Sequence, residues 1–134
     1  MFCSYAATEI VGEKKKLRNS SSVVFTASIS GYNNVAPANG IYGTSKSALS
    51  TYMKYAALEL AGKGIRCNAV QPGRINTPLI SNRLLSEEDV TKDIEQYPMK
   101  RYGKPEEVAH AIIYLLSDAS AWVTGTNLVI DGGR

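Results

Sequence analysis

Short β-branched apolar runs alternate with longer amphipathic segments, and this alternation restricts the fold more than any other feature of the sequence. The runs with the composition of strands are "SSVVFTAS" at 21–28, "IRCNAV" at 65–70 and "TNLVID" at 126–131. The segments between them are long enough to form helices. Strands separated by helices pair in parallel, because a parallel neighbour needs a crossover connection. We therefore predict an α/β fold, with a parallel sheet and helices on its faces.

The segment 41–61 carries the clearest helical pattern. Gly62 and Gly64 are suited to end this helix. The apolar residues that recur at helical spacing, and that we predict to form its buried face, are Ala48, Leu49, Tyr52, Ala56 and Leu60.

Two later helices and one earlier helical pattern are also predicted. Ser86, with Asp89 three residues later, is close to a capping box and begins a polar helix that runs to Gln96. Pro105 lies in the first turn of another helix, which ends near Ser117. Its apolar face is predicted to contain Val108, Ile112, Leu115 and Leu116. Residues 4–16 begin as a helical pattern and end in charge.

Composition indicates one globular unit. The chain has 134 residues, of which 44% are hydrophobic and 20% charged. The formal net charge of +3 is concentrated in "EKKK" at 13–16, which is typical of a solvated surface and not of a nucleic-acid site. No apolar run approaches the roughly 18 residues of a membrane span, and the first residues do not have the pattern of a secretory signal. We expect a cytoplasmic protein that binds neither nucleic acid nor membrane.

Cysteine and histidine offer no metal or triad chemistry. Cys3 and Cys67 form neither a Cys-x-x-Cys pair nor a metal spacing, which is consistent with a reducing compartment. His110 is the single histidine, so neither a histidine-based triad nor a metal cluster can be built around it. Any chemistry is expected to use other groups and no metal.

Tyr42 and Lys46 lie one helical turn apart in "YGTSK". Pairs at this spacing are common by chance, so neighbouring segments must decide whether this one has a function. A free phenol has a pKa near 10 and exchanges protons poorly at neutral pH. A lysine ammonium one turn away favours the phenolate form, which makes such a tyrosine a better acid or base.

Four motifs occur in a recognisable order: "VVFTASISG", "YGTSK", "GIRCNAVQPGRINTP" and "GKPEEVAHAIIYLLSDASAWVTGTNLVIDGG". In this order the chain resembles the C-terminal half of the short-chain dehydrogenase/reductase family. It is particularly similar to the branch with 3-oxoacyl-carrier-protein reductases and related sugar and polyol dehydrogenases. The resemblance implies a partial doubly wound, Rossmann-type parallel sheet made of the last three strands and their helices. Residues 1–134 would be the C-terminal portion of a single NAD(P)-binding domain.

The resemblance also implies roles for three residues. Tyr42 would exchange a proton with the substrate oxygen, and Lys46 would hold the nicotinamide ribose in addition to favouring the phenolate. Ser28 would donate a hydrogen bond to the substrate carbonyl and stabilise its developing charge. The interval from Ser28 to Tyr42 is one residue longer than the family's commonest spacing, which makes Ser30 an alternative. We prefer Ser28 because Gly31 follows it at the family's Ser-x-x-Gly offset.

The resemblance assigns cofactor contacts to the segment after the strand 65–70. Pro72 and Gly73 would let the backbone approach the nicotinamide, although the same pair also suits a plain turn that ends a strand. The Ile75 backbone and the Thr77 hydroxyl would meet the carboxamide or the nearby phosphate. The polar residues 79–100 would cover the substrate.

No glycine-rich phosphate loop occurs in the sequence. The resemblance implies that this loop precedes residue 1, so we expect a truncated enzyme. The intact parent would use NADP or NAD to interconvert a small-molecule carbonyl and alcohol, as a homodimer or homotetramer. Acyl-carrier thioester, sugar, polyol and steroid substrates stay open, as does the choice of NAD or NADP. The alternative is a catalytically silent remnant that acts only through protein association.

Overall fold

The computed structural model describes residues 21–78 and 86–134 of the chain. The predicted pattern at 4–16 lies outside the described residues. The elements of the described residues, in chain order, are β1 (Ser21–Thr26), the 3₁₀ helix η1 (Ile29–Gly31), α2 (Gly40–Ala61), β2 (Ile65–Pro72), α4 (Glu87–Glu95), α5 (Pro105–Leu116), the 3₁₀ helix η2 (Asp118–Ser120) and β3 (Asn127–Ile130).

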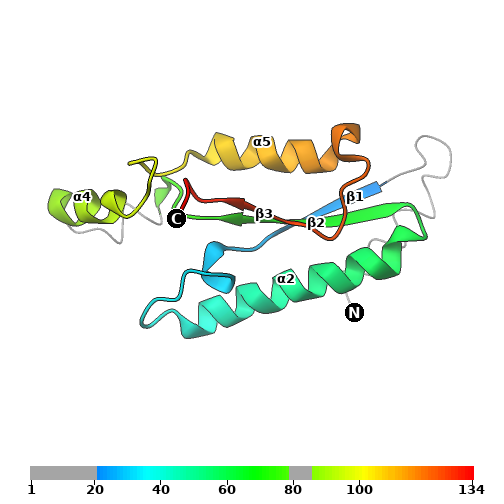
Figure 1. The fold of residues 1–134 in the computed structure, drawn as a ribbon, viewed down its shortest axis with the longest axis horizontal. Helices are drawn as coiled ribbons and strands as arrows, with labels where there is room; N and C mark the ends of the chain where they lie inside the picture. Colours follow the sequence, from blue (N-terminus) through cyan, green and yellow to red (C-terminus); the bar gives the residue numbers. More distant parts are fainter. Residues whose placement is uncertain (1–20, 79–85) are drawn as a thin grey trace.

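The three strands form one parallel sheet in the order β1-β2-β3. Ser21 to Thr26 of β1 lie opposite Ile65 to Val70, and Asn127 to Ile130 of β3 lie opposite Ala69 to Pro72. Helix α2 covers one face of the sheet and α5 covers the other (Figure 1). The predicted α/β fold and its parallel sheet are confirmed.

The core lies between β2 and α2. Every residue from Ile65 to Gln71 is buried, because β2 is the central strand and has a helix on each face. The residues that pack together in this core are Ala27, Met53, Ala56, Ala57, Leu60, Ile65, Cys67 and Ala69. The turn from α2 into β2 passes through Gly64, whose φ of 73° is in the left-handed region that favours glycine.

A buried arginine joins the other face of β2 to the end of α5. Arg66 Nη1 donates to the carbonyl of Leu115 at 2.9 Å, and Nη2 donates to the carbonyl of Ser117 at 3.0 Å. Nη1 also lies within hydrogen-bond distance of Ser120 Oγ and the Val123 carbonyl. The guanidinium therefore satisfies the last carbonyls of the helix, which have no partner within the helix itself.

Two parts of the predicted buried faces are wrong. On α2, Ala48 is exposed while Leu49 and Tyr52 are only partly buried, and the buried residues are Ser50, Met53, Ala56, Ala57 and Leu60. Apolar spacing alone could not predict this face, because small and polar residues form part of it. Ser50 is one of them, and its Oγ accepts a hydrogen bond from Gln71 of β2. On α5, Leu115 is fully buried but Leu116 is 49% exposed, because the last residue of the helix points away from the sheet.

Helix α4 begins as predicted. Ser86 Oγ accepts a hydrogen bond from the Asp89 backbone amide at 3.1 Å and donates one to Asp89 Oδ2 at 2.8 Å. The helix lies beyond the carboxyl ends of β2 and β3, at the left in Figure 1.

Candidate active site

The predicted site residues lie at one edge of the sheet, where its parallel strands end. Strand β1 ends at Thr26, β2 ends at Pro72, and α2 begins at Gly40 after the chain leaves β1. This edge faces left in Figure 1. In open α/β sheets, ligands bind outside the carboxyl ends of the strands.

Ser28 lies two residues beyond β1, which is shorter than the predicted strand. It is 8% exposed and is the N-cap of η1, where its Oγ accepts a hydrogen bond from the Ser30 amide at 3.2 Å. Ser30 Oγ in turn accepts a hydrogen bond from Asn39 Nδ2 at 3.2 Å. Both hydroxyls keep a proton to donate, so the choice of Ser28 over Ser30 stays a prediction from the Ser-x-x-Gly offset.

Tyr42 and Lys46 lie beside each other at the start of α2. The Lys46 ammonium is 5.7 Å from the centre of the Tyr42 ring, and Nζ donates a hydrogen bond to the Thr26 carbonyl at 2.9 Å. Tyr42 is 46% exposed, so a ligand can reach it. An ammonium group has three donors, and two of those on Lys46 remain for a ligand at this edge.

Two glycines allow η1 and α2 to touch. A Cβ on Gly31 would lie 2.5 Å from the Ser47 nitrogen, and one on Gly43 would lie 2.8 Å from the Ser30 carbonyl oxygen. This close backbone contact fixes the loop that carries Ser28 against the helix that carries Tyr42. Gly43 was not among the predicted site residues, although glycine inside a helix costs about 1 kcal/mol relative to alanine and so indicates a packing requirement.

The loop after β2 turns close to the end of β3. Gly73 donates a backbone hydrogen bond to Ile130 at 2.9 Å, and a Cβ on it would lie 3.0 Å from the Asp131 Cα. Pro72 is the last residue of β2, and Thr77 lies farther along the loop and is partly buried.

Ile75 forms an isolated parallel bridge with Gly103. The Gly103 amide donates to the Arg74 carbonyl at 3.0 Å, and the Asn76 amide donates to the Gly103 carbonyl at 2.8 Å. In such a bridge the N–H and C=O of Ile75 itself point away from Gly103. Among the described residues these two groups have no hydrogen-bond partner, so they are available to a ligand.

Comparison with known proteins gives one consistent result. Residues 2–134 match the family described as "Enoyl-(Acyl carrier protein) reductase". The chain is 42% identical over 111 residues to a cyclohexanol dehydrogenase of Acinetobacter sp., covering 83% of this chain and 42% of that protein. It is 42% identical over 118 residues to the 3-oxoacyl-acyl-carrier-protein reductase FabG of Thermotoga maritima, covering 88% of this chain and 46% of that protein.

A solved structure agrees with these matches. A short-chain type dehydrogenase/reductase from Mycobacterium ulcerans superimposes with a TM-score of 0.85 at 36% identity, covering 96% of this chain and 45% of that one. This chain belongs to the short-chain dehydrogenase/reductase family. The resemblance stated from the sequence is confirmed, and the relatives are oxidoreductases. The chain spans less than half the length of these relatives.

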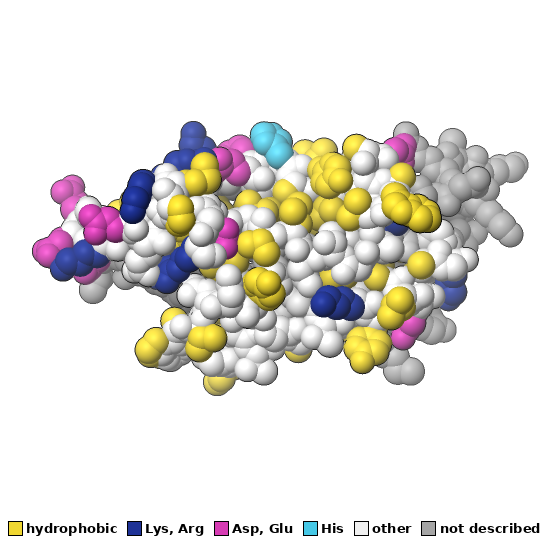
Figure 2. All heavy atoms as spheres, viewed as in Figure 1, with side chains coloured by type: hydrophobic (Ala, Val, Ile, Leu, Met, Phe, Trp, Pro, Cys, Tyr) yellow, Lys and Arg dark blue, Asp and Glu magenta, His cyan; other side chains and the backbone are white. Residues whose placement is uncertain are grey.

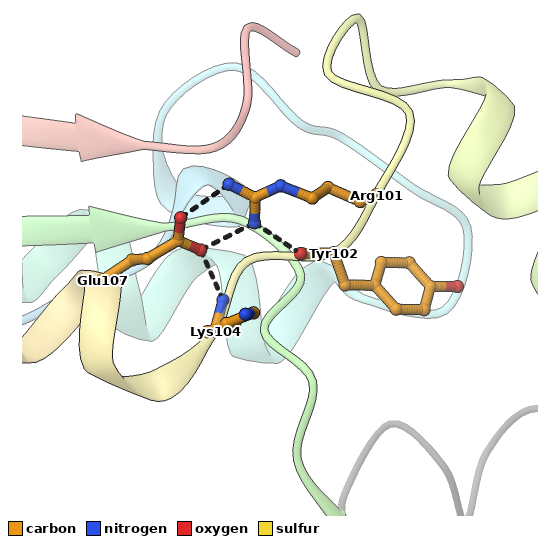
Figure 3. Close-up of polar contacts among 4 residues, drawn as sticks. All are labelled: Arg101, Tyr102, Lys104 and Glu107. Atoms are coloured by element: carbon orange, nitrogen blue, oxygen red, sulfur yellow. Dashed lines mark hydrogen bonds and ion pairs between the residues drawn. The ribbon is translucent and has the colours of Figure 1, made fainter.

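In this short-chain dehydrogenase/reductase chain, an ion pair fixes the segment before α5 (Figure 3). Arg101 makes two parallel hydrogen bonds to Glu107, at 2.7 and 2.6 Å, and a third to the Tyr102 carbonyl. The Lys104 amide also donates to Glu107 at 2.7 Å. The hydrogen bonds from Arg101, and then the one from Lys104, lower the pKa of Glu107 to about 2.

A small hollow adjoins the loop that carries Gly73 and Ile75. Its volume is about 110 Å³, and its charged lining residues are Arg74, Arg101, Glu107 and Asp131. None of the predicted site residues lines this hollow. It lies between the loop after β2, the segment before α5 and the end of β3.

The described residues contain no candidate metal site. Within 21–78 and 86–134, no group of three His, Cys, Asp or Glu side chains could hold a metal ion. Cys67 is buried in the core, where burial raises the pKa of its thiol. In the same part of the chain, no helix combines the length and the apolarity that crossing a bilayer requires.

Proposed function

We propose that this chain carries the catalytic tyrosine and lysine of an NAD(P)-dependent oxidoreductase that interconverts a ketone and an alcohol. One observation carries the proposal: the Lys46 ammonium stands 5.7 Å from the Tyr42 ring at the carboxyl edge of the sheet, and Tyr42 is open to solvent. The names of two relatives, a cyclohexanol dehydrogenase and a 3-oxoacyl reductase, support the same reaction class.

The residues at this edge fit a nicotinamide dinucleotide, which would supply the hydride when bound. Lys46 has two free donors for the hydroxyls of a ribose, since only one of its three is used by Thr26. The free N–H and C=O of Ile75 complement a carboxamide, which has one acceptor and one donor group. Pro72 and Gly73 would let the backbone come close, and the Thr77 hydroxyl would contact the carboxamide or phosphate.

Proton transfer would belong to Tyr42. As a hydride adds to the carbonyl carbon, the Tyr42 hydroxyl would give its proton to the carbonyl oxygen, and in the reverse direction the phenolate would remove it. The positive charge of Lys46, beside the ring, would oppose the negative charge that the transfer leaves on the Tyr42 oxygen. The Ser28 hydroxyl would donate a hydrogen bond to the same substrate oxygen while negative charge develops there.

Replacing Tyr42 tests this proposal. Residues 1–134 would be joined to the N-terminal portion of the Thermotoga maritima reductase, and turnover would be measured with NADH and NADPH on a panel of ketones. In this hybrid, Tyr42→Phe should lower turnover by about 10² to 10⁴-fold, because it removes the proton donor and this is the usual contribution of a general acid. The variant lacks only a hydroxyl, so the fold should be kept. The melting temperature should not change.

The matched control is Tyr55→Phe, which removes a hydroxyl from an exposed tyrosine on the same helix. It should leave turnover unchanged. Near-normal turnover of Tyr42→Phe would contradict the assignment of Tyr42 as the acid.

The alternative function is association without catalysis. It is favoured by the large apolar side chains that α2 and the C-terminal part expose, among them Tyr55, Leu58, Trp122 and Val129. The resemblance to the family implies oligomer surfaces on this helix and on the last strand, so a homodimer or homotetramer of the parent would use the same residues. A hybrid that assembles but turns over no ketone with either cofactor would favour this alternative.

A further inference from the structure

Asp93 is the one buried residue of α4, a helix that is otherwise mostly exposed. Its side chain is 11% exposed and has two polar partners. Tyr102 donates its hydroxyl proton to Asp93 Oδ2 at 2.7 Å, and Arg74 Nε lies 3.1 Å from the same oxygen. One carboxylate oxygen therefore connects two segments that are separate in the sequence.

The two partners of Asp93 directly precede the two residues of the isolated bridge. Arg74 comes before Ile75, and Tyr102 comes before Gly103. The backbone joins the same segments, because the Gly103 amide donates to the Arg74 carbonyl. Asp93 thus joins the two segments through side chains, and the bridge joins the same two segments through the main chain.

The contacts of Asp93 are strong ones. A hydrogen bond to a carboxylate is charge-assisted, and a buried carboxylate makes few of its bonds to water. Burial and the neighbouring Asp93 raise the pKa of Tyr102 to about 12, so this hydroxyl keeps its proton, and remains a donor, throughout the neutral range.

The segment 101–103 is held from both sides. Glu107 of α5 binds Arg101, while Asp93 of α4 binds Tyr102, whose ring also packs edge-on against Tyr97 at 6.2 Å. Among the described residues, the loop 74–76 has one side-chain anchor of this kind, the contact between Arg74 and Asp93. The backbone bridge to Gly103 joins the same loop to the segment before α5.

We propose that Asp93 is a positioning residue for the dinucleotide. By joining Arg74 to Tyr102, it keeps the free N–H and C=O of Ile75 turned toward the nicotinamide carboxamide. This inference rests on the proposed function for the identity of the ligand, and on the described contacts for the mechanical role of Asp93.

Hydrogen–deuterium exchange, measured residue by residue by mass spectrometry, tests the mechanical role in the 134-residue chain. Asp93→Ala should speed exchange of the Asn76 and Gly103 amides, the two donors of the bridge, by about tenfold, the effect of losing roughly one hydrogen bond's worth of stability. The Gly73 amide, bonded to β3, should keep its rate. Unchanged exchange at both bridge amides would overturn the proposal.

Two further variants separate this role from a general loss of structure. Tyr102→Phe removes one contact of Asp93 and should give a smaller effect at the same two amides. Glu88→Gln removes a carboxylate from the exposed face of α4, where it pairs with Lys92, and should change neither amide. A Glu88→Gln effect equal to that of Asp93→Ala would contradict a specific role for Asp93.

Ligand binding to the hybrid protein tests the consequence for the cofactor. Asp93→Ala should weaken NADH or NADPH binding by about fivefold, while ADP-ribose, which lacks the nicotinamide, should bind with nearly its original affinity. Equal weakening of both ligands would show a merely structural role and overturn the proposal. The assay involves no turnover, so a failure of Tyr42 as the acid would leave its result intact.

Discussion

Lys46 makes two contacts in the first turns of α2. Its ammonium donates to the carbonyl at the end of β1 and also lies beside the Tyr42 ring, so one side chain joins helix to sheet and places a positive charge near the tyrosine. Arginine is also positively charged, but its planar guanidinium places its donors differently from a compact ammonium, so it should replace lysine only in part. Methionine keeps much of the bulk without the charge.

We therefore expect a graded effect of substitutions at Lys46. In the hybrid protein, Lys46→Arg should retain part of the turnover, whereas Lys46→Ala and Lys46→Met should lose about 10² or more of it, because charge beside a proton-transferring group matters most. Steady-state kinetics with both cofactors would measure this. If all three variants keep the turnover of the unsubstituted hybrid, Lys46 is an ordinary surface lysine.

The site residues predicted from the sequence share one property, which is that local spacing places them. Tyr42 and Lys46 are one helical turn apart, so local geometry alone brings them together, and Ser28 could be placed by its offset from Gly31. Asp93 could not be predicted in the same way. It stands in a polar helix and is buried only because Arg74 and Tyr102, from two distant segments, converge on it.

At the scale of elements, strands were easier to predict than helix faces. The runs of β-branched residues placed all three strands to within about two residues at each end, the usual uncertainty of such boundaries. The buried face of α2 depends on tertiary packing, which selected Ser50 and Met53 over Ala48. The bridge between Ile75 and Gly103 was not predicted, because no local pattern marks a pairing of single residues.

Glu107, in the first turn of α5, should make the stability of the fold depend on pH in the acid range. Glu107 has a folded pKa of about 2 against an ordinary value of 4.5, so its carboxylate stabilises the fold above that ordinary value. This contribution is lost as the pH falls from 4.5 toward 2. Glu107→Gln should therefore show a flatter fall of melting temperature across this acid window than the original chain.

Circular dichroism melting curves at a series of pH values would make this comparison. The control is Glu106→Gln, which removes an exposed carboxylate from the same turn. It should keep the original pH dependence. If Glu107→Gln and the original chain lose stability in parallel, the ion pair with Arg101 contributes nothing to the fold.

At the scale of the whole molecule, the free edge of the sheet and the exposed apolar side chains should decide whether the chain associates with itself. Among the described residues, β1 pairs only with β2, so its other side presents free backbone groups. Figure 2 shows hydrophobic side chains over α5 and the loop after it, and charged ones at the α4 end. The exposed apolar residues there include Ile113, Leu116 and the 99% exposed Trp122.

We expect the 134-residue chain to associate with itself and to bind neither NADH nor NADPH with useful affinity. The first expectation follows from the open strand edge and the apolar surface, and the second from the lack of a glycine-rich phosphate loop in the sequence. Light scattering over a concentration series and fluorescence titration of both cofactors would test them. A stable monomer that binds either cofactor tightly would contradict both.

Helix α5 is fixed at both ends by residues outside it. Arg101 binds Glu107 in its first turn, and Arg66 of β2 binds the carbonyls of Leu115 and Ser117 at its other end. Each added residue lengthens a helix by about 1.5 Å and rotates its end by about 100°. A single insertion or deletion between these anchors would leave one arginine facing the wrong side of the helix, so α5 should tolerate changes of residue type on its exposed face but not changes of length.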